Sequence, residues 1–384
     1  MTSQSPTPAS TPAAAPSSSS GGTRLRLRWL APAVAAGVVA AGVAVPRLAD
    51  ASDAAERLAP VTAAELLVAV SEAKVDGLSG TVVATSRLGL PELPTAQGGG
   101  GGSALSLPGL LSGSTTARVW TSGDDRSRLA VDGPFAEYDV VRDGRDLWTY
   151  DSASSGVTRL VLPETAPGQE PAQPPVESAV TPQQAAELLL GLVDASTQVS
   201  VGDREMVAGR PAYELVLDPR DPDTLIDTVR IAVDGETFLP LRVRVLGTGQ
   251  VEPALEIGFT SVRFEQPDPS VFAFVPPPGS EVTERSLDAL TGAKRPAEGP
   301  GAREVPVLPA GARPQVLGEG WASVVALPPV ELPEDAAVLV GQLSTPVQGG
   351  RVVTSALLTV LLLDDGRVLA GAVPPAQLLE LSRS

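Results

Sequence analysis

The sequence contains no cysteine and no histidine. Without cysteine, the chain cannot form a disulfide, a thiolate nucleophile, a Cys-ligated zinc site or a lipidated N-terminal cysteine. Without histidine, it lacks the commonest general acid or base near pH 7, which also excludes Ser-His-Asp triads and His-ligated metals. These two absences favour a protein that is not an enzyme, and we predict no catalytic residue, no metal and no cofactor.

Common motifs of phosphate binding and nucleophilic catalysis are also missing. The sequence has no G-x-x-x-x-G-K-[ST] loop, no G-x-G-x-x-G after a strand and no G-x-S-x-G elbow. Asp218, Asp221 and Asp223 have a spacing that could ligate calcium, but no Gly-x5-Glu segment follows them, and a Pro-rich turn explains them. Neighbouring carboxylates, as in "SGDDRSR", cap a turn and do not face each other across a cleft.

Cations and aromatic residues are scarce. The chain has two lysines, Lys74 and Lys294, a formal net charge of −17 and 3% aromatic residues. Because phosphate binding needs a Lys/Arg surface, we predict no nucleic-acid partner. A hydrophobic content of 43% excludes global disorder, and 384 residues allow two domains with a sizeable core.

The first 51 residues have the composition of a targeting segment. Residues 1–23 are mostly Ser, Thr, Pro, Ala and Gly without charge, which is typical of a disordered cytoplasmic leader. In residues 24–51, three arginines precede an apolar run from Trp29 to Val45, and an Ala-Asp-Ala site ends at Ala51. We predict a signal peptide cleaved near Ala51 or an uncleaved membrane anchor, with everything after residue 51 outside the cytoplasm.

Two amphipathic helices begin with the same signal. Thr62 precedes Glu65 by three residues and Thr181 precedes Gln184 by three, which is the spacing of a capping box. Pro182 adds a first-turn proline to the second helix. The expected apolar stripes are Leu66, Val70 and Ala73 in the first helix and Ala185, Leu188, Leu189, Leu192 and Val193 in the second.

Most of the chain up to about residue 275 alternates with the period of a β-strand. The alternation places Leu239, Leu241, Val243 and Val245 opposite Arg242 and Arg244; Val229, Ile231 and Val233 opposite Thr228 and Arg230; and Tyr213, Leu215 and Leu217 opposite Glu214. Asp-Gly turns at 132–133, 143–144 and 234–235 favour an antiparallel meander with one apolar and one wet face. The fold prediction is α+β, a curled antiparallel half-barrel that encloses two or more helices. Space that the helices leave unfilled would be a hydrophobic cavity, a usual form of lipid site.

A Gly-rich insertion separates the first expected strand, Gly80 to Arg87, from the next, Ala117 to Thr121. Five consecutive glycines make the insertion flexible. Its apolar residues are Leu105, Leu107, Leu110 and Leu111. The insertion is either a lid over the cavity, a membrane contact or a tolerated low-complexity segment.

The C-terminal region forms a separate unit in this interpretation. Residues 284–315, rich in Pro and Gly, predict a linker between a domain at 52–283 and a small α+β domain at 316–384. Asp365-Gly366 predicts the turn of a hairpin, and Pro374-Pro375 predicts the start of a final helix. A unit of this size is expected to pack on its neighbour.

Several segments resemble a known family. "DGRDLWTYDSASSGVTRL" is similar to the D-G-x-x-L-W-x-Y-D segment, turn and x-V-T of LolA-type periplasmic lipoprotein carriers. That family's F-x-F-x-P-P-x-G ending is matched here by Phe272, Phe274, Pro276, Pro277 and Gly279. The order of elements is similar from about residue 61 to 283. "EGWASVVAL" and "VLAGAVPPAQLLEL" resemble the second domain of the RseB/MucB type.

The resemblance implies a half-open barrel whose apolar concavity holds acyl chains, and a small domain that contacts a membrane-bound anti-sigma factor. We therefore predict an exported, membrane-proximal, non-enzymatic carrier or sensor that binds lipid or the acyl chains of lipoproteins. The alternative is an envelope-stress regulatory adaptor that binds an anti-sigma factor or another membrane protein.

Seven residues are candidates for the lining of the lipid cavity, and each is alternatively plain core. They are Trp120, Trp148, Tyr150, Tyr213, Ile231, Leu241 and Val243. Trp148 and Tyr150, two residues apart, are expected on one face of a hairpin. There they would face the concavity, where a lipid chain meets its head group, or pack against the helices.

Overall fold

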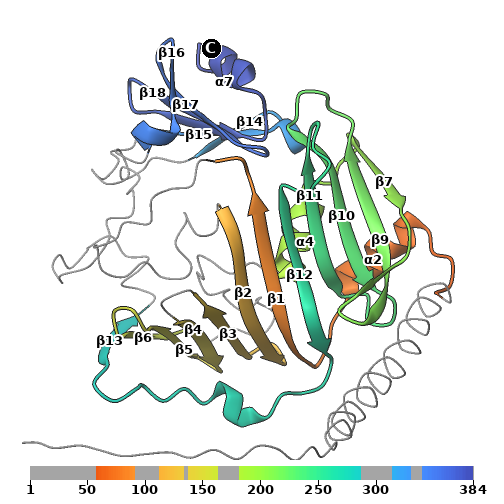
Figure 1. Cartoon of the computed structure of the whole chain (residues 1–384), viewed down its shortest axis with the longest axis vertical. Helices are drawn as coiled ribbons and strands as arrows, with labels where there is room; N and C mark the ends of the chain where they lie inside the picture. The colour runs from red at the N-terminus through yellow and green to blue at the C-terminus, as the bar shows by residue number, and fades with distance from the viewer. Residues whose placement is uncertain are drawn as a thin grey trace, which may run out of the picture. The chain divides into compact units, whose positions relative to one another are not determined.

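The computed structural model describes residues 58–90, 112–133, 137–162, 181–286, 314–329 and 340–383 (Figure 1). Several predictions lie outside these ranges: the leader (1–23), the signal segment (24–51), most of the linker (284–315) and the lid leucines Leu105, Leu107, Leu110 and Leu111. All described residues belong to one compact unit, Ala51–Ser384. None of the helices in the described ranges is long and apolar enough to cross a bilayer.

Both predicted capping boxes are confirmed. Helix α2 (Ala63–Glu72) starts after Thr62, whose hydroxyl accepts from the Glu65 backbone N–H at 3.3 Å while the Glu65 carboxylate accepts from the Thr62 N–H at 2.9 Å. Helix α4 (Pro182–Leu190) starts after Thr181, which exchanges the same two bonds with Gln184. Reciprocal bonds of this kind satisfy backbone donors that a helix start would otherwise leave free.

The predicted apolar stripe of α4 is wrong in part. Its buried residues are Pro182, Ala185 and Ala186, whereas Leu188 is 69% exposed. Small side chains at Ala185 and Ala186 let the helix backbone approach the sheet closely, and this orientation turns Leu188 away from the core. In α2, the expected Leu66 and Val70 are buried.

Thirteen of the described strands form one large, curled sheet (Figure 1). Their order is β13-β6-β5-β4-β3-β2-β1-β12-β11-β10-β9-β7, with β8 also paired to β9. The strands are β1 (Gly77–Arg87), β2 (Ser112–Ser122), β3 (Arg126–Asp132), β4 (Glu137–Asp143), β5 (Asp146–Asp151), β6 (Gly156–Val161), β7 (Thr197–Val201), β8 (Glu205–Val207), β9 (Arg210–Pro219), β10 (Ile226–Asp234), β11 (Pro240–Gly247), β12 (Leu255–Arg263) and β13 (Glu281–Ser286). Among the described pairs, β13 runs parallel to β6 and the others are antiparallel, so the predicted meander differs at one edge.

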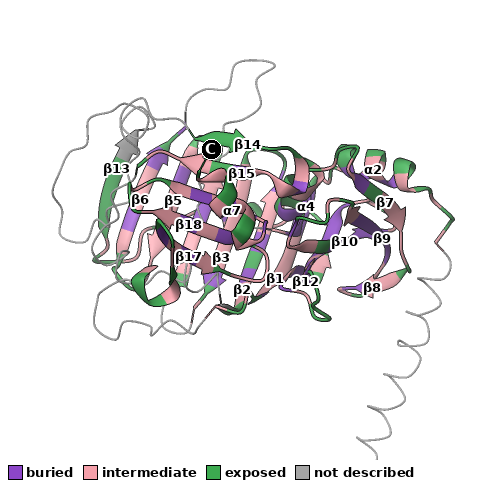
Figure 2. Cartoon of the chain, turned by 90° about the horizontal axis from the view of Figure 1, so that it is seen from above, coloured by how far each residue is buried: buried purple, intermediate pink, exposed green. Residues whose placement is uncertain are grey.

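Strand alternation gives this sheet a face that carries the main core. Leu241 and Val243 are 0% and 1% exposed, while Arg242 between them points to the other side and pairs with Glu205. We call the side of Leu241 and Val243 the inner face and the opposite side the outer face. Buried residues of α2 and α4 belong to the same core cluster as Leu241 and Val243. Both helices therefore pack on the inner face, α2 against β7 and β9 and α4 against β11 and β12 (Figure 2).

Six further described strands form a second sheet near the C-terminus, in the order β14-β15-β19-β18-β17-β16. They are β14 (Gln315–Leu317), β15 (Val324–Leu327), β16 (Thr345–Val347), β17 (Gly350–Thr354), β18 (Thr359–Leu363) and β19 (Val368–Gly371). The predicted hairpin and final helix are confirmed: β18 pairs with β19 around Gly366, which has φ +85°, and α7 (Pro375–Leu381) follows Pro374. The predicted domain boundaries at residues 283 and 316 stay predictions.

The six-stranded sheet contacts the large sheet through Trp321, in the short 3-10 helix η2 (Gly320–Ala322). Trp321 is 2% exposed within the core of the large sheet, and its indole Nε1 donates to the Thr197 hydroxyl at 2.8 Å. Backbone bonds add two further contacts, from Leu225 N to Ala372 O at 2.7 Å and from Ala356 N to Leu88 O at 2.8 Å. The smaller sheet is therefore anchored by one buried aromatic side chain and by backbone hydrogen bonds.

Candidate functional site

The apolar inner face continues onto β2–β6. Cross-strand pairs connect it: Phe259 pairs with Val82, Val82 with Ala117 and Ala117 with Val131. Two apolar clusters lie on the inner face of β2–β6 and at the residue after β6, and we call their members the apolar extension. They are Ala117, Leu129, Val131, Tyr138, Val140, Leu147, Leu160 and Leu162. Half-buried Leu129 packs against the main core and against both smaller clusters of the extension. One apolar surface therefore runs from the main core to β6.

The two helices of the inner face, α2 and α4, lie at the other half of the large sheet. The extensive contacts of α2 and α4 are with β7, β9, β11 and β12 (Figure 2). In the strand order, β1 lies between β12, on which α4 packs, and β2–β6. The inner face is thus wider than the part that α2 and α4 cover, and six of the eight residues of the apolar extension are buried although they lie outside the main core cluster to which these helices contribute.

Four of the seven lining candidates lie in the main core. Tyr213, Ile231, Leu241 and Val243 are at most 5% exposed. The Tyr213 hydroxyl donates to the Ala59 carbonyl at 2.9 Å, and its ring stacks on Phe238 with centroids 6.3 Å apart. These side chains are packed as core, which is the alternative that the sequence left open.

The other three candidates, Trp120, Trp148 and Tyr150, lie on the outer face. Trp120 pairs with Arg128, Arg128 with Val141 and Val141 with Trp148, so these residues share one side. The neighbouring inner-face positions are Leu129, Val140 and Leu147. As expected, Trp148 and Tyr150 share one face of a hairpin. That face is directed away from the helices, so the structure does not bring the seven candidates together.

The outer face of β3–β6 is covered by the segment 268–286, which we call the strap. Its short 3-10 helix η1 (Pro269–Phe272) places Phe272, 1% exposed, against β3 and β4. Phe274 follows, with ring centroids 5.5 Å from Trp148 and 6.3 Å from Tyr150. The strap then pairs with the β6 edge as β13. The Phe-x-Phe-x-Pro-Pro tail of the sequence therefore has a packing role that the alternation pattern did not predict.

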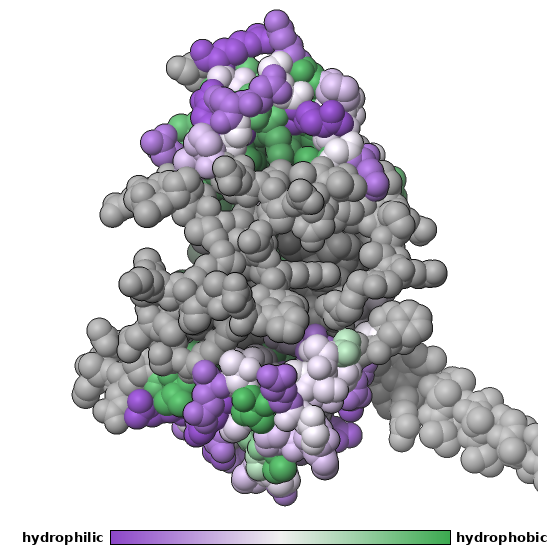
Figure 3. Space-filling view, turned by 90° about the vertical axis from the view of Figure 1, so that its left-hand side faces the viewer, coloured by the Kyte–Doolittle hydropathy of each residue, from purple (hydrophilic) through white to green (hydrophobic). Residues whose placement is uncertain are grey.

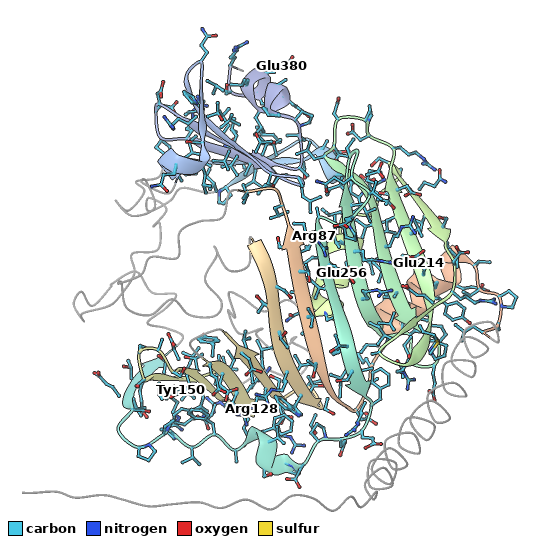
Figure 4. All side chains as sticks on the ribbon, in the orientation of Figure 1. Arg87, Arg128, Tyr150, Glu214, Glu256 and Glu380 are labelled. Carbon is cyan, nitrogen blue, oxygen red and sulfur yellow. The ribbon has the colours of Figure 1, made fainter. Side chains whose placement is uncertain are left out.

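Arginines attach the strap to the sheet. Arg128 donates to the Val271 carbonyl at 3.1 Å and is held by the Asp139 carboxylate at 2.5 Å (Figure 4). Arg159 lies over the Trp148 ring at 5.3 Å and pairs with Asp146 at 2.8 Å and Glu284 at 3.1 Å. The hydrogen bonds that Arg159 donates, first to Asp146 and then to Glu284, raise the pKa of its guanidinium.

Replacing Phe274 by leucine should loosen the strap. The change removes two aromatic contacts, each worth about 0.5–1.5 kcal/mol beyond its buried area, and it should expose Trp148 further to water. We expect a red shift of tryptophan emission and a lower unfolding midpoint in urea. Val275→Ala is the matched control, because Val275 is 80% exposed and one residue away. Equal emission spectra for both variants would contradict the packing of Trp148 under the strap.

The outer face over β8–β12 was expected to be wet, and this expectation is wrong at its centre. Glu214 is 4% exposed and accepts from Arg244 at 2.5 Å and Arg230 at 3.3 Å (Figure 4). Arg242 and Arg244 both pair with Glu205. The Glu214 carboxylate can be buried because arginines of β10 and β11 pair with it, which is what a buried carboxylate requires. Across the described ranges, no group of three or more acidic side chains is arranged to hold a metal ion.

No protein-family model matches the sequence, and no curated protein matches it. Among solved structures, the chain is similar to one from the Pseudomonas aeruginosa MucA/MucB complex, with 19% identity, 83% of this chain and 96% of that chain covered, and a TM-score of 0.41. It is also similar to a LolA superfamily protein from Nitrosomonas europaea, with 14% identity, 56% and 98% covered, and a TM-score of 0.23. MucB and LolA are the two types of protein that the sequence resemblance names. Because the TM-scores lie below 0.5, we transfer neither ligand nor partner from these proteins.

Proposed function

We propose that this chain binds the hydrocarbon chains of a lipid or a lipoprotein on the apolar extension. In this proposal it acts as an exported, membrane-proximal carrier or sensor without enzymatic activity. The side chains support the binding of hydrocarbon, since seven of the eight residues of the apolar extension are aliphatic. The absence of cysteine and histidine from the whole sequence supports a role in binding.

The observation that carries the proposal is the width of the inner face. The main core continues through Leu129 onto β2–β6, whereas α2 and α4 pack on the half of the sheet that ends at β7. A hydrocarbon chain on the apolar extension would extend the same core by ordinary apolar contact. Burial contributes about 25 cal/mol per Å2 of apolar surface, from which the cost of ordering the ligand is subtracted.

Leu129→Asn should weaken the binding of a fluorescent C16 fatty acid to the full-length chain. Leu129 is half-buried where the main core meets the extension, so the variant places an amide in the apolar contact. An unsatisfied amide there costs about 1–3 kcal/mol, a loss of at least about fivefold in affinity. A fluorescence titration measures the change.

Val251→Asn is the matched control, because Val251 is 95% exposed and outside both apolar clusters. The control should bind as the unmodified chain does. The proposal fails if the unmodified chain takes up no fatty acid, or if Leu129→Asn binds it as tightly as the control.

The adaptor alternative stays a prediction. In this alternative, residues 316–384 would contact an anti-sigma factor or another envelope protein. A pull-down that depends on residues 316–384 and persists after delipidation would support it. Lipid that co-purifies with the chain in native mass spectrometry would support the carrier instead.

A further inference from the structure

The six-stranded sheet has two apolar faces of very different burial. One face packs under α7: Val324, Leu361 and Leu378 are each 0% exposed in a cluster that also contains Val352 and Leu369. Cross-strand pairs place Leu361 opposite both Leu369 and Val352, so these residues share that side. This face is an ordinary small core.

The opposite side, which we call the open face, is also aliphatic. Two rows of cross-strand pairs define it. The first row is Val316–Val325–Ala370–Val360–Val353, and the second is Leu327–Val368–Leu362–Arg351. Leu358 lies two residues before Val360. Val316, Leu358 and Val325 are 67%, 44% and 37% exposed, and the remaining side chains are intermediate. None of these residues belongs to a core cluster of the described chain. Figure 3 shows hydrophobic groups on this sheet between hydrophilic ones.

The open face begins beside the end of β1. Ala356, in the turn before Leu358, donates its backbone N–H to the Leu88 carbonyl at 2.8 Å. Gly247 approaches the same turn so closely that a Cβ there would lie 2.8 Å from the Ala356 carbonyl. β1 pairs along its length with β2, where the apolar extension starts. In Figure 1, α7 lies on the side of the six-stranded sheet away from β1 and β2. The open face thus lies next to the end of β1 and the start of β2, whereas Figure 1 shows β3–β6, which carry most of the apolar extension, farther from the six-stranded sheet.

We propose that the open face is a second wall of the hydrocarbon-binding site and contacts the same acyl chain as the apolar extension. This inference rests on the proposed function. Exposed contiguous apolar surface of this kind marks a binding surface. Its chemistry fits hydrocarbon, because its side chains are Val, Leu and Ala without an aromatic ring. The one charged residue in the two rows, Arg351, donates to Ser344 and to the Gly341 carbonyl. A net charge of −17 opposes an anionic membrane surface as the occupant.

Val325→Asp tests the second wall in the full-length chain. Val325 is partly exposed, so the fold should tolerate the carboxylate, whereas an acyl chain in contact with it would bury a charge. We expect at least about tenfold weaker binding of the fluorescent C16 fatty acid, with an unchanged melting temperature. Val251→Asp is the matched control and should bind normally. Val325→Thr keeps the side-chain volume and should weaken binding by a smaller factor, which keeps the test valid if the aspartate variant does not fold.

The outcomes separate the two proposals. If the unmodified chain binds no fatty acid, the proposed function itself fails. If Leu129→Asn weakens binding while Val325→Asp and Val325→Thr bind normally, the acyl-chain site stands and the second wall is overturned. A dimer of the unmodified chain in sedimentation that Val325→Asp dissociates, with fatty-acid affinity unchanged, would assign the open face to a second copy and would also overturn the inference.

Discussion

Trp321→Ala is expected to lower the free energy of unfolding by about 3–5 kcal/mol, the usual cost of truncating a buried tryptophan. Trp321 is 2% exposed, and it comes from the C-terminal part of the chain into the core of the large sheet. Its removal leaves a cavity between the two sheets and leaves the Thr197 hydroxyl without the indole donor. We therefore expect β14–β19 to exchange amide hydrogens faster than the large sheet does.

Trp321→Phe separates the two contributions of this side chain. Phenylalanine fills most of the space but cannot donate to Thr197, so the loss should be nearer to about 1 kcal/mol, the net value of a hydrogen bond. Urea unfolding measures both variants, and hydrogen exchange locates the loosened strands. A Trp321→Ala variant with unchanged stability and uniform exchange would show that the indole does not anchor the smaller sheet.

Asp234→Asn should cost about 3–5 kcal/mol, because it removes the charge from a buried, fully bonded pair. Asp234 is 0% exposed at the end of β10. Its carboxylate accepts from Arg210 Nε at 2.5 Å and Nη2 at 3.0 Å, from the Thr237 N–H at 2.8 Å and from the Thr237 hydroxyl at 2.9 Å. An asparagine cannot accept all of these bonds, and it leaves the Arg210 guanidinium without its buried partner.

The same pair makes stability depend on pH. Burial raises the pKa of Asp234, but the hydrogen bonds from Arg210 and Thr237 lower it more, so its pKa lies below the usual value. A carboxyl whose pKa is depressed by folding stabilises the folded state above its unfolded pKa of about 3.9. That contribution is lost as pH falls through the lower folded pKa. The stability gap between the unmodified chain and Asp234→Asn should thus be full at pH 7 and shrink below about pH 4.

Glu236→Gln is the control for this pair. Glu236 also accepts from Arg210, but its side chain is 82% exposed, so water screens the interaction. Its removal should change stability little at any pH. Equal losses for Asp234→Asn and Glu236→Gln, or a gap that stays constant down to pH 2, would contradict the role assigned to the buried carboxylate.

Local signals in the sequence predicted local structure well. The capping boxes at Thr62 and Thr181 and the Asp-Gly turn at 143–144 depend on neighbouring residues alone, and the structure has them as expected. The parallel pairing of β13 with β6 depends on contacts more than a hundred residues apart. Periodicity carries no information about such pairs.

The candidate site was harder to predict because alternation separates two faces without saying which one is inner. Trp148 and Tyr150 were correctly placed on one side of their hairpin, but the strap that covers that side comes from residues 268–286. A signal for the apolar extension was present, since "RSRLAVD" alternates through Leu129 and Val131. Aromatic residues were favoured as lining of a lipid cavity, so the aliphatic residues Leu129 and Val131 were not among the predicted candidates.

Photo-crosslinking tests most directly whether the inner face of β2–β6 holds a hydrocarbon chain. The full-length chain would be irradiated with a diazirine-bearing C16 fatty acid, and the labelled peptides would be mapped by mass spectrometry. We expect labels on Leu129, Val140 and Leu147, and their loss when unlabelled palmitate competes. Labels confined to outer-face residues such as Trp148, or labelling that palmitate does not reduce, would contradict an acyl-chain site on this face.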